Sequence, residues 1–223
     1  MASTLTEHLS QTKSTSGVSE AAYAAFLSGP VSKWASWAIW GDKVDDLSVF
    51  DIAGRPWERL RSDVLILGGN TGLVGDGEMK RCGNFHTAGH SPDGKLRNSL
   101  RGTPLEGAFL SDVVKDYPTK DSGPLKRDIK NGAFDIRAHV VDPLLDELEL
   151  LGSPDEVIVL LLGKETLNVW DAVMSHDAVP QSLLSRLTVV TGLPHHSKAG
   201  ALAQPVQDLL ASPLQPHPAA VAG

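Results

Sequence analysis

The segment Asp63–Gly72, DVLILGGNTG, constrains the fold of this chain more than any other. Its apolar run, Val64–Leu67, is short and β-branched and stops at two glycines, which is typical of a buried strand in a parallel sheet. In open α/β sheets, ligands bind just beyond the carboxyl ends of the strands. We therefore expect Asn70 to lie on a ligand-binding turn, where glycines let a ligand approach the backbone.

Length and composition predict one globular domain. The chain has 223 residues, of which 41% are hydrophobic and 21% charged. No apolar run is long enough to cross a bilayer, and the first residues lack the pattern of a secretory signal. The single cysteine, Cys82, excludes an internal disulfide and a four-cysteine iron–sulfur cluster. We expect a cytoplasmic monomer that does not bind membranes.

Charge is distributed unevenly along the chain. The net charge is −7, yet residues 80–130 hold ten Lys and Arg against six Asp and Glu. A local basic face on an acidic protein can hold a phosphate backbone. The alternative is a solvated surface whose charges form ion pairs. From the charge distribution alone, we favour this alternative over nucleic-acid binding.

Apolar patterns predict alternating helices and strands. We expect helices over Ser19–Ser28, Lys95–Arg101, Ile136–Leu151 and Lys164–Asp171. We expect strands over Val64–Leu67, Gly107–Val114, Glu156–Leu162 and Leu187–Val190. The predicted class is therefore α/β with a mostly parallel sheet of four strands. One domain over residues 18–203 is expected between a disordered tail, 1–17, and an Ala/Pro-rich tail, 204–223.

Three tryptophans, Trp34, Trp37 and Trp40, are spaced three residues apart. This spacing predicts a helix with three indoles along one side. We favour burial in the core, because tryptophans at helical spacing usually bury their large area. The alternative is a platform on which bases stack.

Polar residues follow three of the predicted strands. They are Asn70, Asp112 and the run His195-His196-Ser197. Because the carboxyl ends of parallel strands meet at one edge of a sheet, we expect these side chains to lie close together.

These residues resemble, in order, the motifs of the uracil-DNA glycosylase superfamily. Gly68–Gly72 is similar to the first motif, G-x-N-P-G, with Thr71 in place of the proline. Asn84-Phe85-His86 resembles the segment that carries the base-stacking aromatic residue. Ser111–Pro118, SDVVKDYP, resembles a motif that has Asn where this chain has Asp112.

Two further motifs complete the resemblance. Leu161–Thr166 resembles a strand that ends in Leu-Gly before a helix, and His195-His196-Ser197 matches the motif H-P-S in its first and last residues. The similarity spans residues 64–200, and residues 94–122 resemble a divergent bacterial branch without iron–sulfur cysteines. It implies a three-layer α/β/α fold and a DNA glycosylase that needs no cofactor or metal.

The resemblance also implies residue roles. Asn70 would orient the attacking water, and His195 would donate to the base oxygen as charge develops there. Phe85 would stack on the extruded base. The other base contacts would be Gly69, Thr71, Gly72 and Asp112. The DNA contacts would be Arg101, Lys115, Ser197 and Lys198.

Asp112 predicts a substrate other than uracil. Uracil presents an N–H donor and an oxygen acceptor. An amide side chain can hydrogen-bond to both, whereas an ionised carboxylate can only accept hydrogen bonds. Hypoxanthine presents the same edge, so a base with an exocyclic amine would suit Asp112 better. Alternatively, Asp112 pairs with Lys115 or Arg101.

Simpler interpretations of these residues remain open. Asn70 could cap the next segment or form an Asx turn, the histidines could be surface residues, and Phe85 could cover the core. Cys82, His86 and His90 are four residues apart and could bind zinc on a helix, although nearby glycines argue against a helix.

Two other functions compete with a glycosylase. The first is a catalytically silent relative that binds nucleic acid or a nucleotide at the same cleft. The second is an unrelated phosphate-binding α/β enzyme, which we rank last because the glycine turn lacks a Walker lysine and a full G-x-G-x-x-G.

Overall fold

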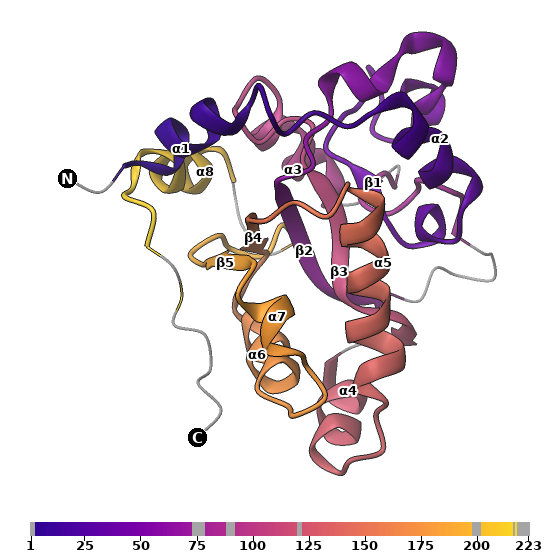
Figure 1. The fold of residues 1–223 in the computed structure, drawn as a ribbon, viewed down its shortest axis with the longest axis vertical. Helices are drawn as coiled ribbons and strands as arrows, with labels where there is room; N and C mark the ends of the chain where they lie inside the picture. Colours follow the sequence, from indigo (N-terminus) through magenta and orange to yellow (C-terminus); the bar gives the residue numbers. More distant parts are fainter. Residues whose placement is uncertain are drawn as a thin grey trace.

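A single five-stranded sheet forms the centre of the molecule (Figure 1). The structure, a computed structural model, describes residues 3–72, 79–87, 92–119, 122–197, 202–215 and 217. The sheet order is β1-β3-β2-β4-β5. The strands are β1 (Ser36–Trp37), β2 (Val64–Gly72), β3 (Phe109–Thr119), β4 (Val157–Leu161) and β5 (Leu187–Val190). Only β1 is antiparallel to its neighbour. The predicted α/β class is confirmed, but the sheet has five strands, not four.

Strand β2 extends beyond its apolar run. It pairs with β4 only as far as Leu67, opposite Leu161, and then continues beside β3, with Gly68 opposite Asp112 and Asn70 opposite Val114. The expected turn after Leu67 is therefore wrong, because the long strand β3 offers pairing partners to the glycine segment.

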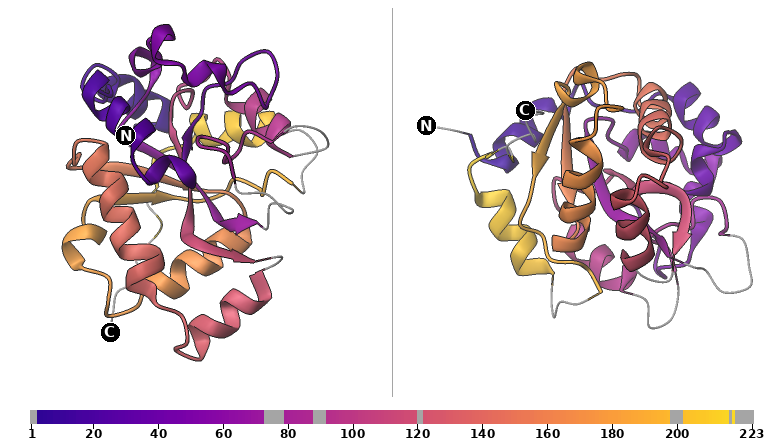
Figure 2. Two further views of the ribbon diagram at one scale, coloured as in Figure 1. Left: turned by 90° about the vertical axis from the view of Figure 1, so that its right-hand side faces the viewer. Right: turned by 90° about the horizontal axis from the view of Figure 1, so that it is seen from below.

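Helices cover both faces of the sheet. Leu65 and Leu67 of β2 belong to one core, whereas Val64 and Ile66 belong to the other. The first core includes residues of α2 (Glu20–Ser28), α4 (Ser122–Lys130), α5 (Asp142–Leu150), α6 (Lys164–Met174) and α7 (Gln181–Leu184). The second includes residues of α1 (Leu5–Thr12), α3 (Asp93–Leu100) and α8 (Ala203–Ala211). Figure 2 shows the two sets of helices from further directions.

Local sequence signals account for several of these helices. Helix α2 follows Ser19, whose hydroxyl accepts a hydrogen bond from the Ala22 amide at 3.1 Å. The helix predicted over Ile136–Leu151 is present, but it begins with a π-helical turn, η5 (Arg137–Val141). Pro143 explains this turn, because it has no N–H for the usual bond one turn back. Within the described residues, no helix has the length and apolar character needed to cross a membrane.

The three tryptophans do not lie on one helix. Trp37 is in the short strand β1 and is fully buried in the first core, whereas Trp40 is 4% exposed and lies in the second. The helix prediction is wrong because two-residue alternation along an extended segment sends these indoles to opposite faces. Burial of Trp37 and Trp40 is as expected.

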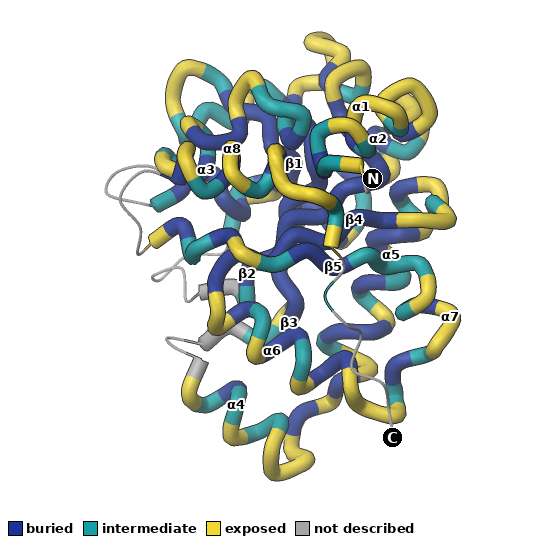
Figure 3. Tube along the Cα trace, turned by 90° about the vertical axis from the view of Figure 1, so that its left-hand side faces the viewer, coloured by how far each residue is buried: buried dark blue, intermediate teal, exposed yellow. Residues whose placement is uncertain are grey.

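Both terminal segments contribute helices to the core, contrary to the expected tails. Helices α1 and α8 lie side by side (Figure 1). Leu5 and Leu9 of α1 pack in the same core as Val206 and Leu210 of α8, and all four are buried. The Leu5 amide also donates to the Ser212 carbonyl at 3.1 Å. Figure 3 shows the buried strands enclosed by partly exposed helices.

Candidate functional site

Asp112 and Phe85 meet above Gly68 of β2. A Cβ at position 68 would overlap Asp112 Oδ1 and lie 3.2 Å from Phe85 Cζ. Glycine is therefore needed here because two side chains occupy the space above its backbone. The structure thus brings together three residues, Gly68, Phe85 and Asp112, from three of the sequence motifs.

A hydrogen-bond chain holds the Asp112 carboxylate. Its Oδ2 accepts from Asn84 Nδ2 at 3.0 Å, and the same nitrogen donates to the Trp34 carbonyl at 2.7 Å. Asp112 is only 4% exposed. The sequence suggested Lys115 or Arg101 as alternative partners of this carboxylate. In the structure, Lys115 pairs with Glu147, and Arg101 donates to backbone carbonyls.

Phe85 has an unusual backbone conformation. Its φ is +61°, in the left-handed region that bulky residues rarely adopt. The Trp40 indole donates to the Phe85 carbonyl at 3.2 Å and helps to hold this conformation. The ring is 6% exposed and belongs to the second core, so it packs over that core as well as over Gly68. Strained residues of this kind concentrate at functional sites.

The His195 ring has a defined hydrogen-bond environment. Its Nδ1 accepts from the Ser197 amide at 3.1 Å and lies 2.6 Å from the Ser197 hydroxyl. Because Nδ1 is an acceptor, the proton of the neutral ring is assigned to Nε2. A Cβ on Gly163, just beyond β4, would lie 2.6 Å from His195 Cβ, so this glycine allows the His195 loop to approach the sheet.

His196 links His195 to Phe85. The His195 and His196 rings stack with centroids 4.5 Å apart, and the Phe85 centroid lies 5.5 Å from that of His196. His196 is 7% exposed, and its Nε2 lies 3.4 Å from Asp93 Oδ1. Asp93 was missed from the sequence, because its position before a basic helix suggests only helix initiation.

Asn70 lies further along β2. Its Nδ2 donates to the Tyr117 carbonyl of β3 at 3.4 Å, and the residue lies in strand β2 rather than in the expected turn. A Cβ on the neighbouring Gly69 would lie 3.6 Å from Thr166 Oγ1, which places the first turn of α6 beside this segment. Thr71 and Gly72 continue strand β2.

The four predicted DNA contacts have different environments. Lys115 is not available to phosphate: its side chain is 1% exposed and its Nζ lies 3.1 Å from Glu147 Oε2, which corrects that expectation. Arg101 Nη2 donates to the carbonyls of Trp40 and Gly41 at 3.2 and 3.3 Å. Ser197 is exposed, and Lys198 lies outside the described residues.

Cys82 and His86 are both buried. The two ring nitrogens of His86 each lie 2.9 Å from a backbone carbonyl oxygen, those of Asn84 and Ile39. Burial lowers the pKa of His86 and raises the pKa of the Cys82 thiol to about 12. His90 lies outside the described residues, and no cluster of three metal-ligating side chains occurs among those that the structure describes.

A cavity of about 320 Å³ adjoins the His195 loop. It is lined by residues at the ends of β4 and β5 and the start of α6: Leu161, Gly163, Lys164, Leu167, Thr191, Gly192, Leu193 and Pro194.

Comparisons with protein-family models, curated proteins and solved structures found no match.

Proposed function

We propose that this protein is a DNA glycosylase that extrudes a damaged or modified base and hydrolyses its N-glycosidic bond. The observation that carries the proposal is the position of the Asp112 and Phe85 side chains over Gly68, with the His196 ring beside Phe85 and stacked on that of His195. This arrangement gathers a carboxylate, an aromatic ring and imidazoles at one place. An extruded base needs these three kinds of group.

Each proposed role follows from the chemistry of its group. Water adds to the anomeric carbon as the C–N bond breaks, and the bonding electrons leave with the base. Asn70 holds that water by hydrogen bonds without acting as a strong base. The Nε2 proton of His195 stabilises the negative charge that develops on the base.

Asp112 favours a base with an exocyclic amine. An ionised carboxylate accepts two hydrogens from an amine, whereas it repels the O4 oxygen of uracil. Asn84 donates to one carboxylate oxygen, and the other oxygen lies over Gly68. Because Phe85 and Asp112 are 6% and 4% exposed, a base must displace neighbouring side chains to reach them.

That burial also favours a second candidate, a catalytically silent protein that binds nucleic acid or a nucleotide at this edge of the sheet. A carboxylate fixed by Asn84 and a ring packed in the core are compatible with a structural role. In this case the polar residues would bind a ligand without cleaving it.

Base release distinguishes the two candidates. Purified protein is incubated with single- and double-stranded oligonucleotides that carry uracil, hypoxanthine or modified cytosines, and release and binding are both measured. We expect release of at least one base, reduced about 10²-fold or more in His195→Ala and strongly in Asn70→Ala. Exposed residues outside the site provide matched controls, Asn131→Ala and His176→Ala.

The result can contradict either candidate. Binding without release of any base supports the silent binder, and failure to bind any oligonucleotide overturns both the glycosylase and a silent protein that binds nucleic acid. Asp112→Asn, which introduces the amide, should raise uracil release relative to that of an amine-bearing base. An unchanged preference would show that Asp112 does not read the base.

A further inference from the structure

A larger cavity lies at the opposite end of β2 from Asn70. Its volume is about 630 Å³, within the range of small-molecule sites. Its walls come from α1, the segment before β2 and the turn before β3: Leu9, Ser10, Lys13, Gly17, Glu58, Arg59, Leu60, Arg61, Gly102, Thr103, Pro104 and Glu106. Because Arg61 precedes β2 and Asn70 lies near its end, this cavity is separate from the candidate site.

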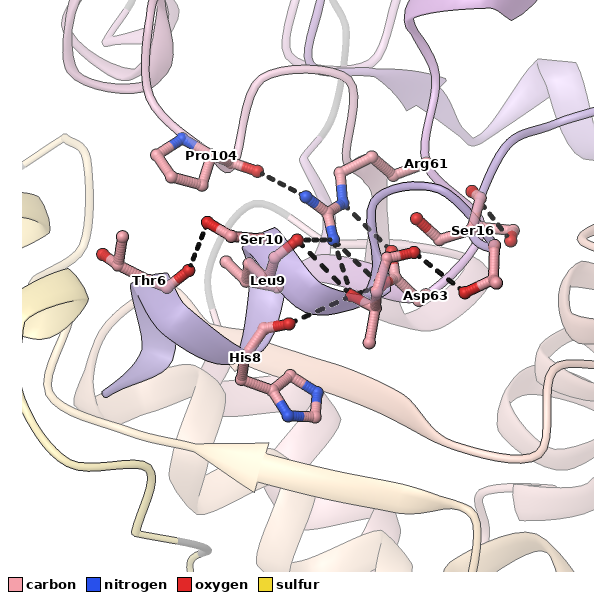
Figure 4. A network of polar contacts seen from close by, with 11 residues as sticks. Thr6, His8, Leu9, Ser10, Ser16, Arg61, Asp63 and Pro104 are labelled. Atoms are coloured by element: carbon pink, nitrogen blue, oxygen red, sulfur yellow. Dashed lines mark hydrogen bonds and ion pairs between the residues drawn. The ribbon is translucent and has the colours of Figure 1, made fainter. Parts of the chain in front are cut away.

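A buried guanidinium, that of Arg61, forms part of the cavity wall. Figure 4 shows it among Asp63, Leu9 and Pro104. Arg61 is 5% exposed, and its Nε and Nη2 donate to the Asp63 carboxylate at 3.0 and 2.9 Å. Nη2 also donates to the Leu9 carbonyl at 3.0 Å. Nη1 makes a single hydrogen bond, to the Pro104 carbonyl at 3.1 Å, so one of its two hydrogens has no acceptor among the described residues.

The carboxylates around the cavity already have partners. Glu58 lies 2.6 Å from Arg55, and Glu106 Oε2 accepts from the Gly102 amide at 2.8 Å. The cations are less well matched. Arg59 lies 3.8 Å from Glu106, at the limit of an ion pair, and Lys13 has no ion pair or hydrogen bond in the part of the chain that the structure describes. The cavity therefore has unmatched positive charge.

We propose that this cavity binds a small organic anion. Its phosphate or carboxylate group would meet the remaining Nη1 hydrogen of Arg61 and the side chains of Lys13 and Arg59, because a guanidinium suits such planar or tetrahedral oxyanions. The apolar side chains of Leu9, Leu60 and Pro104 would contact its carbon skeleton. The volume of about 630 Å³ has room for an occupant larger than an inorganic ion.

Titration calorimetry and thermal unfolding of the full chain test this site. The probes are adenosine 5′-monophosphate, citrate, inorganic phosphate and, as the uncharged control, adenosine. We expect at least one of the two organic anions to bind and to raise Tm, with inorganic phosphate weaker and adenosine inactive. The double variant Lys13→Ala/Arg59→Ala should lose about tenfold or more in affinity for that anion.

A matched double variant on α4, Arg127→Ala/Lys130→Ala, removes the same charges far from the cavity lining and should bind as the unmodified protein does. Preference for the phosphate or the carboxylate probe identifies the anionic group. The proposal is overturned if neither organic anion binds, if adenosine binds equally well, or if both double variants lose affinity equally. None of these outcomes depends on base release.

Discussion

Glu147 Oε2 lies 3.1 Å from Lys115 Nζ in the protein interior, where the two side chains are 0% and 1% exposed. The other carboxylate oxygen accepts from Ser111 Oγ at 2.5 Å and Trp34 Nε1 at 3.1 Å. Lys115 Nζ and Glu147 Oε2 face each other without hydrogen-bond geometry, so their attraction is that of an ion pair alone.

Removing one member of this pair should be costly. Lys115→Met leaves a buried, unpaired carboxylate, and we expect it to lower the free energy of unfolding by about 3–5 kcal/mol. The double variant Lys115→Met/Glu147→Leu should recover much of that loss. Urea denaturation measures both. The control Lys126→Met removes the half-exposed ion pair with Glu165, which should cost only about 0–1 kcal/mol. If Lys115→Met and Lys126→Met lowered the free energy of unfolding equally, burial of the ion pair would not explain the cost.

Gly68 and Gly69 should respond differently to alanine. A Cβ at position 68 would overlap Asp112 and crowd Phe85, whereas at position 69 the nearest atom, Thr166 Oγ1, would be 3.6 Å away. We expect Gly68→Ala to cost about 1–3 kcal/mol and to abolish ligand binding at the site, and Gly69→Ala to cost little. Denaturation and oligonucleotide binding measure the two effects. A tolerated Gly68→Ala would mean that Asp112 and Phe85 do not meet over this residue.

Acid should destabilise the protein through His86. Burial lowers the pKa of His86 in the folded state below its ordinary value of 6.5, although the carbonyls of Ile39 and Asn84 and the charge of Asp93 oppose the shift. The unfolded state therefore binds the proton first. This contribution to stability is complete above about pH 6.5 and is lost as the pH falls toward the folded pKa. The urea concentration at the unfolding midpoint should fall less steeply between pH 7.5 and 5 in His86→Gln than in the unmodified protein. An identical slope in the two proteins would contradict a contribution of His86 to acid sensitivity.

Cys82 should react slowly in the folded protein. Burial raises its pKa to about 12, so almost no thiolate is present at pH 8. We expect iodoacetamide to modify Cys82 much more slowly in buffer than in urea, as followed by mass spectrometry. Rapid stoichiometric modification of the native protein would contradict the buried position.

The packing of α1 can be tested with one substitution. Leu9 is fully buried in the second core, and we expect Leu9→Ala to lower the free energy of unfolding by about 2–5 kcal/mol. Ser10 is exposed on the same helix, so Ser10→Ala is the control. Thermal unfolding compares the two. A neutral Leu9→Ala would restore the initial expectation of a disordered tail.

The sequence predicted those elements whose apolar pattern is unambiguous. The strand Leu187–Val190 has the expected bounds because three of its four residues are β-branched, which favours a strand. Helix α1 was missed although its signal is visible: Thr4 and Glu7 form a capping box. Strand β1 has only two residues and gives no periodic pattern, and the tryptophan spacing around it indicated a helix instead.

The site was predictable only in part. Asp112 and Phe85 come from motifs that can be read along the chain, and the structure places both over Gly68. The burial of Lys115 was not predictable, because it depends on Glu147, which lies 32 residues later on α5. Asp93 was missed for the same reason, since its contact with His196 joins distant parts of the chain.

The pairing of α1 with α8 sets an order for folding during translation. Helix α1 leaves the ribosome before the strands, but Leu5 and Leu9 share their core with Val206 and Leu210, which emerge after all five strands. The first core can close around the sheet earlier, because its helices lie between these two. On a nascent chain, the apolar side of α1 therefore lacks its contacts with α8 until residues 203–211 have emerged, which leaves that part of its surface open to chaperones.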